Sequence, residues 1–172
     1  MKRLWAIIPI LVLGLLVLVF AAHSLRRSTS QVTPVAMVGK PLPAISLPPL
    51  AGGPPAPLRA VAKGPVLINF YASWCAPCIQ EAPALMALKA EGVRVVGIAY
   101  KDAPADSAAF LTRYGDPFAQ VVTDRDGRAG LEFGLTGVPE TYAIDAAGVI
   151  RAKHAGPMDA ADAEAMLKKA GL

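Results

Sequence analysis

In this 172-residue chain, apolar residues form one long uninterrupted run near the start and shorter, periodic patterns further along. Residues 4–22 form a run of nineteen residues without a charge. As a helix this run is roughly 28 Å long, close to the thickness of the hydrocarbon core of a bilayer. We therefore expect a transmembrane anchor at 4–22 after a cytoplasmic stub at 1–3. A cleaved secretory signal is the alternative, because Lys2 and Arg3 give the chain a basic start.

The segment after the anchor lacks any hydrophobic period. Residues 23–37 are short, polar and without periodicity, which predicts a flexible tether. A folded domain is then expected over 38–172. Its first part, residues 39–64, is interrupted by many prolines and glycines and predicts short extended pieces and turns. The fragment "AISL" at 44–47 is typical of an edge strand.

Strand and helix patterns alternate through the remainder of the chain. A continuous apolar run at 65–71 predicts a buried strand, apolar residues at helical spacing follow from Cys75 to Ala90, and residues 93–100 predict a second buried strand. Further elements are predicted as helices at 102–114 and 159–170, a strand at 117–122, a helical turn at 128–134 and a hairpin of 140–145 with 149–155. This alternation indicates an α/β domain with a partly parallel central sheet.

The net charge of +4 belongs to the predicted anchor rather than to the domain. Four basic residues flank the apolar run, namely Lys2, Arg3, Arg26 and Arg27. From Ser28 onward 13 basic and 13 acidic residues balance each other. No basic stripe with interleaved aromatic residues occurs, so the sequence gives no support to a nucleic-acid partner.

The only two cysteines of the chain lie in "WCAPC", where a predicted strand ends and a predicted helix begins. The first N–H groups and the positive end of a helix dipole favour the thiolate of Cys75 over its thiol. Cys78 lies one turn further on the same face and is expected to be placed more deeply. Pro77 fixes a backbone angle between the two cysteines, and Trp74 is expected to shield the turn. This arrangement suits attack on a disulfide by Cys75 and displacement by Cys78.

Two structural interpretations compete with a redox pair. A disulfide that closes so short a loop removes little entropy from the unfolded chain, so Cys75 and Cys78 would make a poor staple. A structural zinc site needs about four ligands, and the only histidines are His23, beside the predicted membrane segment, and His154, late in the predicted sheet. Spacing and ligand count therefore favour redox chemistry over metal binding.

Three motifs together resemble the CcmG/DsbE family of cytochrome c maturation: "WCAPC", "VVGIAYKD" and "GVPETYAID". The similarity runs from about Val38 to the C-terminus and includes the N-terminal anchor. It implies a thioredoxin-like fold with a central mixed sheet, tethered to the inner membrane with its domain in the periplasm. It also implies that the chain reduces the haem-binding Cys-x-x-Cys-His motif of apocytochrome c. The implied partners are apocytochrome c and other haem-maturation proteins. The implied electron donor is a membrane protein of the DsbD or CcdA type, and no cofactor beyond the cysteine pair is implied.

The resemblance assigns roles to individual residues. Cys75 matches the attacking thiol and Cys78 the resolving thiol. From the sequence alone Pro139 is an ordinary first residue of a strand, because few X-Pro bonds in folded proteins are cis. The resemblance implies instead a cis-proline that faces the disulfide. Val138 before it would offer backbone groups to an extended substrate.

Acidic residues near these motifs have open assignments. Glu81, in "CIQEAP", either tunes or accepts the proton of the cysteine pair or is a solvated acid near the start of the helix. Glu140 resembles the acid of the family's "PE" pair and would modulate the thiols or meet a partner. Asn69 stands where general thioredoxins carry a buried aspartate, so Glu81 is the nearest group for proton transfer. Asp102 belongs to a loop near the site or caps the next helix.

Other functions remain in competition at this point. One is a general periplasmic disulfide reductase resembling TlpA or ResA. Another, from a different class, is a copper or zinc chaperone resembling Sco proteins that uses Cys75, Cys78 and His154, although Sco proteins have a longer Cys-x-x-x-Cys spacing. A third is a thioredoxin-like scaffold with idle cysteines.

Overall fold

The computed structural model describes residues 12–19 and 37–172. The chain divides into two compact units, Met1–Pro34 and Val35–Leu172. Residues 12–19 are helical. Within the ranges that the model describes, no helix combines the length and the apolar character that crossing a membrane requires. The remainder of the predicted anchor and nearly all of the predicted tether lie outside the described residues.

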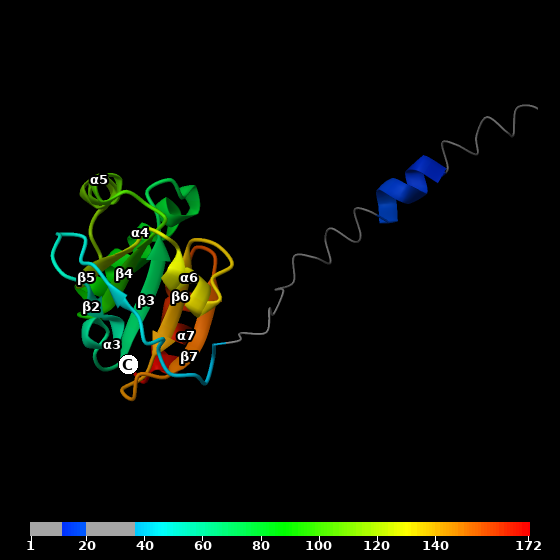
Figure 1. Cartoon of the computed structure of the whole chain (residues 1–172). Helices are drawn as coiled ribbons and strands as arrows, with labels where there is room; N and C mark the ends of the chain where they lie inside the picture. The colour runs from blue at the N-terminus through cyan, green and yellow to red at the C-terminus, as the bar shows by residue number, and fades with distance from the viewer. Residues whose placement is uncertain (1–11, 20–36) are drawn as a thin grey trace, which may run out of the picture. The chain divides into compact units, whose positions relative to one another are not determined.

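A five-stranded mixed sheet forms the centre of the second unit (Figure 1). Its strand order is β5-β4-β3-β6-β7. The pairs of β3 with β4 and of β4 with β5 are parallel, whereas β6 pairs antiparallel with both β3 and β7. The strands are β3 (Val66–Tyr71), β4 (Val95–Tyr100), β5 (Gln120–Asp124), β6 (Glu140–Ile144) and β7 (Ile150–Ala155). A two-stranded sheet of β1 (Ser46–Leu47) and β2 (Ala56–Pro57) precedes them.

The central strand β3 has every residue buried, which explains its continuous apolar sequence. Its side chains alternate between two hydrophobic clusters on the two faces of the sheet. Phe70 belongs to one cluster, together with Phe133 and Tyr142. Tyr71 belongs to the other, where its ring stacks on Phe118 with centroids 4.9 Å apart.

The helices are divided between the two faces of the sheet. The cluster around Tyr71 includes side chains of the helices α4 (Ala76–Ala90), α5 (Pro104–Tyr114) and α7 (Ala160–Ala170). The cluster around Phe70 includes side chains of α3 (Leu58–Val61), of α6 (Arg128–Phe133) and of the segment 42–47. The predicted thioredoxin-like α/β architecture is therefore confirmed, with a mixed central sheet covered on both faces.

Several boundaries differ from the sequence predictions. The helix expected to begin at Cys75 begins at Ala76, because Cys75 has an extended conformation and caps it. The strand expected at 117–122 begins three residues later and ends two residues later, at 120–124, because Phe118 turns inward against Gly97 and Tyr71. The short helix α3 was missed, since its four residues are too few to show a helical period.

Asp102 does not cap the next helix, so that interpretation was wrong. The residue that caps α5 is Ala103, whose side chain has no group that can accept a hydrogen bond. Pro104 follows within the first turn, where a missing backbone N–H costs nothing.

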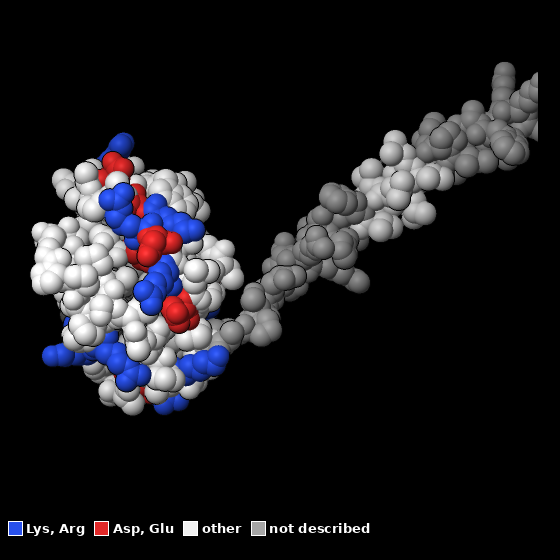
Figure 2. Space-filling view, in the orientation of Figure 1, with Lys and Arg blue, Asp and Glu red and all other residues white. Residues whose placement is uncertain are grey.

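The charges of the domain are mixed on the face shown in Figure 2. Basic and acidic side chains alternate there along a band that runs down the middle of the domain (Figure 2). This pattern accompanies the balance of 13 basic and 13 acidic residues after Ser28. Alternating charges of both signs attract polyanions weakly compared with a continuous basic surface.

Candidate active site

The two cysteines form a disulfide at the start of α4. Their Cα atoms lie 5.4 Å apart, and Cys75 caps the helix with a β-region backbone conformation. The backbone N–H of Cys78 donates to Sγ of Cys75 at 3.2 Å. Pro77 occupies the first turn, where the helix has no use for its missing donor. In the reduced protein the same N–H and the helix dipole favour negative charge on Cys75.

The two sulfur-bearing residues are equally buried in the disulfide form. Cys75 and Cys78 each expose 3% of their surface. The expectation that Cys78 is placed more deeply than Cys75 was therefore wrong for this form. The cause is that both cysteines lie against the cluster around Tyr71, with Val138 packed alongside. In the disulfide form, only a small part of Cys75 is therefore in contact with solvent.

The residues before Cys75 are fixed to the loop after β4. Asp102, which is 5% exposed, accepts from the backbone N–H and the hydroxyl of Ser73, both at 2.7 Å. The indole N–H of Trp74 donates to the carbonyl of Lys101 at 3.3 Å. Trp74 itself is 59% exposed, so it forms part of the surface beside the disulfide. Lys101 has a φ of 46°, a left-handed conformation that a side chain other than glycine rarely adopts.

The peptide bond between Val138 and Pro139 is cis, as the resemblance implied. Pro139 and Pro77 line the same cavity of about 180 Å³, which places this loop beside the Cys-x-x-Cys turn. The other walls of the cavity come from 136–140 and 155–157. An extended peptide that enters here would meet the Val138 backbone and the disulfide region together.

Glu81 is a buried acid on the helix that carries the cysteines. It is 1% exposed, so its interpretation as a solvated acid was wrong. Its Oε1 accepts from Nδ2 of Asn69 at 2.6 Å, and its Oε2 accepts from the backbone N–H of Met158 at 3.3 Å. Burial raises the pKa of Glu81 to about 7, although both hydrogen bonds lower it. Because Glu81 follows Cys78 by three residues, the two share one face of α4.

Glu140 is also buried, with 1% exposed, but it lies in a different environment. Its Oε2 lies 2.8 Å from Nζ of Lys153 and accepts from the hydroxyl of Tyr142 at 2.9 Å. Its Oε1 accepts from both the N–H and the hydroxyl of Thr136. Lys153 also donates to the carbonyl of Gly134 at 3.1 Å. These contacts tie the loop that precedes Pro139 to β6 and β7.

The two glutamates belong to opposite faces of the sheet. On β6, Tyr142 packs in the cluster around Phe70, and Glu140 is two residues from it on the same face. Thr141 points to the other face, where it accepts from the Asn69 amide that also binds Glu81. The cysteines belong to that second face. Glu81 therefore accompanies the cysteines, whereas Glu140 holds the loop that carries Pro139.

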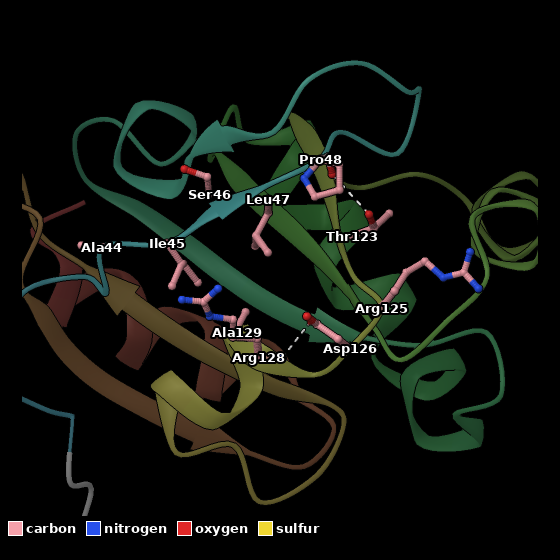
Figure 3. Close-up of a pocket in the computed structure, with 10 residues that line it drawn as sticks. All are labelled: Ala44, Ile45, Ser46, Leu47, Pro48, Thr123, Arg125, Asp126, Arg128 and Ala129. Atoms are coloured by element: carbon pink, nitrogen blue, oxygen red, sulfur yellow. Dashed lines mark hydrogen bonds between the residues drawn. The ribbon is translucent and has the colours of Figure 1, made fainter.

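A larger hollow lies apart from the cysteines. This cavity of about 550 Å³ is enclosed by residues 44–48 and by the segment from Thr123 to Ala129, with the Arg128 side chain beside Ile45 (Figure 3). Arg125 extends away from it (Figure 3). None of the residues around it is a cysteine, so we assign it no part in thiol chemistry.

No group of three or more His, Cys, Asp or Glu side chains that could hold a metal occurs within residues 12–19 and 37–172. His154, the third ligand of the copper-chaperone hypothesis, lies with Nδ1 3.6 Å from Oδ1 of Asp162.

Comparison with known proteins decides the family. The Redoxin family model matches residues 37–167, which is most of the chain. The chain belongs to the Redoxin family. Within this family it is a thiol:disulfide oxidoreductase of the DsbE/HelX type, because curated proteins of that name match over most of its length.

Two curated relatives illustrate the similarity. The thiol:disulfide interchange protein HelX of Rhodobacter capsulatus is 37% identical over 87% of this chain and 88% of its own. The thiol:disulfide interchange protein DsbE of Allochromatium vinosum is 44% identical over 74% of this chain and 71% of its own.

A solved structure agrees with the fold. The thiol:disulfide interchange protein of the thioredoxin family from Chlorobium tepidum TLS has 27% identity and a TM-score of 0.61. The similarity covers 76% of this chain and 94% of that one.

Sequence reasoning missed several residues that support the site. Ser73, Thr136, Thr141 and Lys153 each hold a buried carboxylate or amide in place. The alternation of side chains along β6 could have indicated that Glu140 and Thr141 face opposite ways. Nothing in the sequence indicated that Met158 would supply a backbone N–H to Glu81.

Proposed function

We propose that this chain reduces disulfides in the periplasm, with the Cys-x-x-Cys-His motif of apocytochrome c as its substrate. The observation that carries the proposal is Cys75 at the N-cap of α4, with the Cys78 N–H directed at its sulfur and the cis Val138–Pro139 bond beside the same turn. The resemblance of the three motifs to the CcmG/DsbE family supplies the substrate class.

The reaction starts from the dithiol form. The Cys75 thiolate attacks one sulfur of the substrate disulfide and forms a mixed disulfide, and the other substrate sulfur leaves as a thiolate that takes up a proton. Cys78 then loses its proton and attacks Sγ of Cys75. The second substrate thiolate leaves, and the chain is oxidised to the Cys75–Cys78 disulfide. Two electrons and two protons pass to the substrate.

We assign Glu81 the task of accepting the Cys78 proton. It lies one turn further along α4, and its pKa of about 7 suits proton exchange near neutral pH. Val138 and Pro139 would hold an extended substrate beside the sulfurs, and the exposed Trp74 would offer a further contact surface next to Cys75. Glu140 would not contact the substrate itself but would hold the loop that carries Pro139.

The remaining parts of the proposal concern location and partners. Residues 4–22 would anchor the chain in the inner membrane, with 1–3 on the cytoplasmic side, 23–37 as a tether and 38–172 in the periplasm. A DsbD-type or CcdA-type membrane protein would return the chain to the dithiol form, and other haem-maturation proteins would act beside it. The cysteine pair would be the only redox group, with no further cofactor.

The test compares two substrates of the reduced full-length chain. We expect an oxidised Cys-x-x-Cys-His peptide to be reduced at least tenfold faster than insulin. Equal rates would contradict a dedicated role and would indicate a general reductase. In cells, the C78S variant should accumulate a mixed disulfide through Cys75 with apocytochrome c, and the matched C75S/C78S variant should accumulate none. Full cytochrome c maturation with C75S would overturn the proposal.

A further inference from the structure

Asn69, Thr141 and Glu81 form a polar group in the interior beside the cysteine pair. Nδ2 of Asn69 donates to Oε1 of Glu81 at 2.6 Å and to Oγ1 of Thr141 at 2.9 Å. Asn69 and Thr141 are fully buried, and Glu81 is 1% exposed. Within the described residues, Oδ1 of Asn69 is a buried acceptor without a hydrogen-bond partner. Buried polar atoms are rarely left in this state, because desolvation costs them free energy that no partner returns.

The arrangement fits the carboxylate form of Glu81 only. Both of its oxygens accept, Oε1 from Asn69 and Oε2 from the N–H of Met158. When the carboxyl is protonated it becomes a donor and needs an acceptor. A proton on Oε1 would then point at the N–H of Asn69, and a proton on Oε2 at the N–H of Met158. Two donors facing each other repel, so in this orientation neither hydrogen-bond partner of Glu81 can accept the proton of its acid form.

An acceptor is available on the same side chain. The unpartnered Oδ1 belongs to the amide whose Nδ2 now faces Glu81, so rotation of the amide about its terminal bond exchanges the two atoms. Oδ1 would then lie where it can accept from the Glu81 acid and from the Thr141 hydroxyl. A hydroxyl serves equally as an acceptor and as a donor, so Thr141 fits both orientations.

We propose that the Asn69 amide reverses its orientation whenever Glu81 gains or loses a proton, with Thr141 as the partner common to both orientations. This inference rests on the proposed function, in which Glu81 receives the Cys78 proton. Each orientation leaves one amide atom without a partner, Oδ1 in the carboxylate form and Nδ2 in the acid form. Neither form is therefore strongly preferred, and Asn69 positions the proton acceptor in both.

The surroundings of the group contain few competing charges. Cys78 lies one turn before Glu81 on α4, and β3 contributes only the neutral Asn69. In β7, His154 is the register partner of Thr141, and its Nδ1 lies 3.6 Å from Asp162 of α7. The segment before α7 contributes the uncharged N–H of Met158. Burial raises the pKa of Glu81 to about 7, so both of its forms are populated at neutral pH.

The decisive measurement uses NMR of the oxidised full-length chain in detergent micelles. The side-chain carboxyl carbon of Glu81 and the side-chain amide of Asn69 are followed from pH 5 to pH 9. We expect both signals to titrate with one midpoint, because the amide protons change their hydrogen-bond partners when Glu81 gains or loses its proton. A Glu81 signal that titrates while the Asn69 amide stays constant would overturn the proposal.

Two variants sharpen the test. In E81Q the Met158 N–H retains the side-chain oxygen, so the amide of the new residue faces Asn69 and requires Oδ1 as its acceptor. The Asn69 amide should then keep its acid-form shift at every pH. In N69L both forms of Glu81 lose one hydrogen bond, so the Glu81 pKa should change by less than about half a unit. A fixed donor at Asn69 predicts a rise of about one unit or more, and that rise would contradict rotation.

These outcomes are separable from the proposed function. If E81Q reduces the Cys-x-x-Cys-His peptide at the wild-type rate between pH 6 and pH 8, the proton role of Glu81 is wrong, yet the amide titration still decides the rotation. If N69L does not fold, the wild-type titration and E81Q remain sufficient.

Discussion

Lys153 and Glu140 form a buried ion pair, with 2.8 Å between Nζ and Oε2 and side-chain exposures of 10% and 1%. The pair joins β7 to the first residue of β6, immediately after the cis Val138–Pro139 bond. Because Thr136 also binds Glu140, the loop between them is held at both of its ends. The position of the loop that carries Pro139 thus depends on a charge pair as well as on apolar packing.

Removal of Lys153 alone should lower the free energy of unfolding. In K153M the Glu140 carboxylate stays buried without its cation, which typically costs about 3 kcal/mol of unfolding free energy. The double variant K153M/E140Q removes both charges and should recover at least half of that loss. Urea denaturation of the three proteins measures both values. A single variant as stable as wild type would contradict the structural role given to this pair.

Asp102 should affect both stability and thiol exchange. D102A removes the acceptor of two partly buried hydrogen bonds from Ser73, a loss of about 2 kcal/mol. It also frees the residues before Cys75, so peptide reduction should slow. The matched control is D106A, which removes the same charge from an exposed position on α5. Stopped-flow reduction assays and denaturation would detect the difference, and equal behaviour of the two variants would refute it.

Glu81 should make the stability of the oxidised protein depend on pH. Burial raises its pKa to about 7 from the ordinary value of 4.5, so the folded chain binds this proton more tightly than the unfolded chain does. The unfolding free energy is therefore highest below pH 4.5 for this group and falls as the pH rises from 4.5 to 7. The total change is about 3 kcal/mol.

The control for this pH effect is E81Q, which cannot titrate at this position. Denaturation curves at pH 5 and pH 8 should differ less for E81Q than for wild type. If both proteins lose equal stability between these two pH values, another group is responsible.

Gly97 should tolerate no side chain. A Cβ at this position of β4 would lie 2.7 Å from the Phe118 ring, which is stacked on Tyr71. G97A should therefore lose about 1–3 kcal/mol through overpacking. Gly137 is a suitable control, because a Cβ there meets nothing within 4 Å. Thermal unfolding should show a lower Tm for G97A and little change for G137A, and a G97A protein with wild-type Tm would contradict the packing described here.

The sequence was sufficient to predict the elements whose pattern is formed by residues close together in the chain. The apolar run of β3 and the helical spacing after Cys75 predicted the strand, the helix and the cysteine turn between them, because periodicity reports burial directly. The environments of Glu81 and Glu140 were not accessible in this way. Their partners Asn69 and Lys153 are 12 and 13 residues away in the chain, and only the folded sheet brings each pair together. The short helix α3 was not predicted, because a single helical turn is too short to show a hydrophobic period.

Glu81 and Glu140 occupy opposite faces of the sheet, so under the proposed function the groups that tune the thiols and the groups that hold the substrate would be physically separate. Substitutions around Asn69 and Met158 would alter how readily electrons leave the pair, and those around Lys153 and Thr136 would alter which peptides are accepted. Under that proposal, substitutions could change the substrate range of this protein without changing its reduction potential.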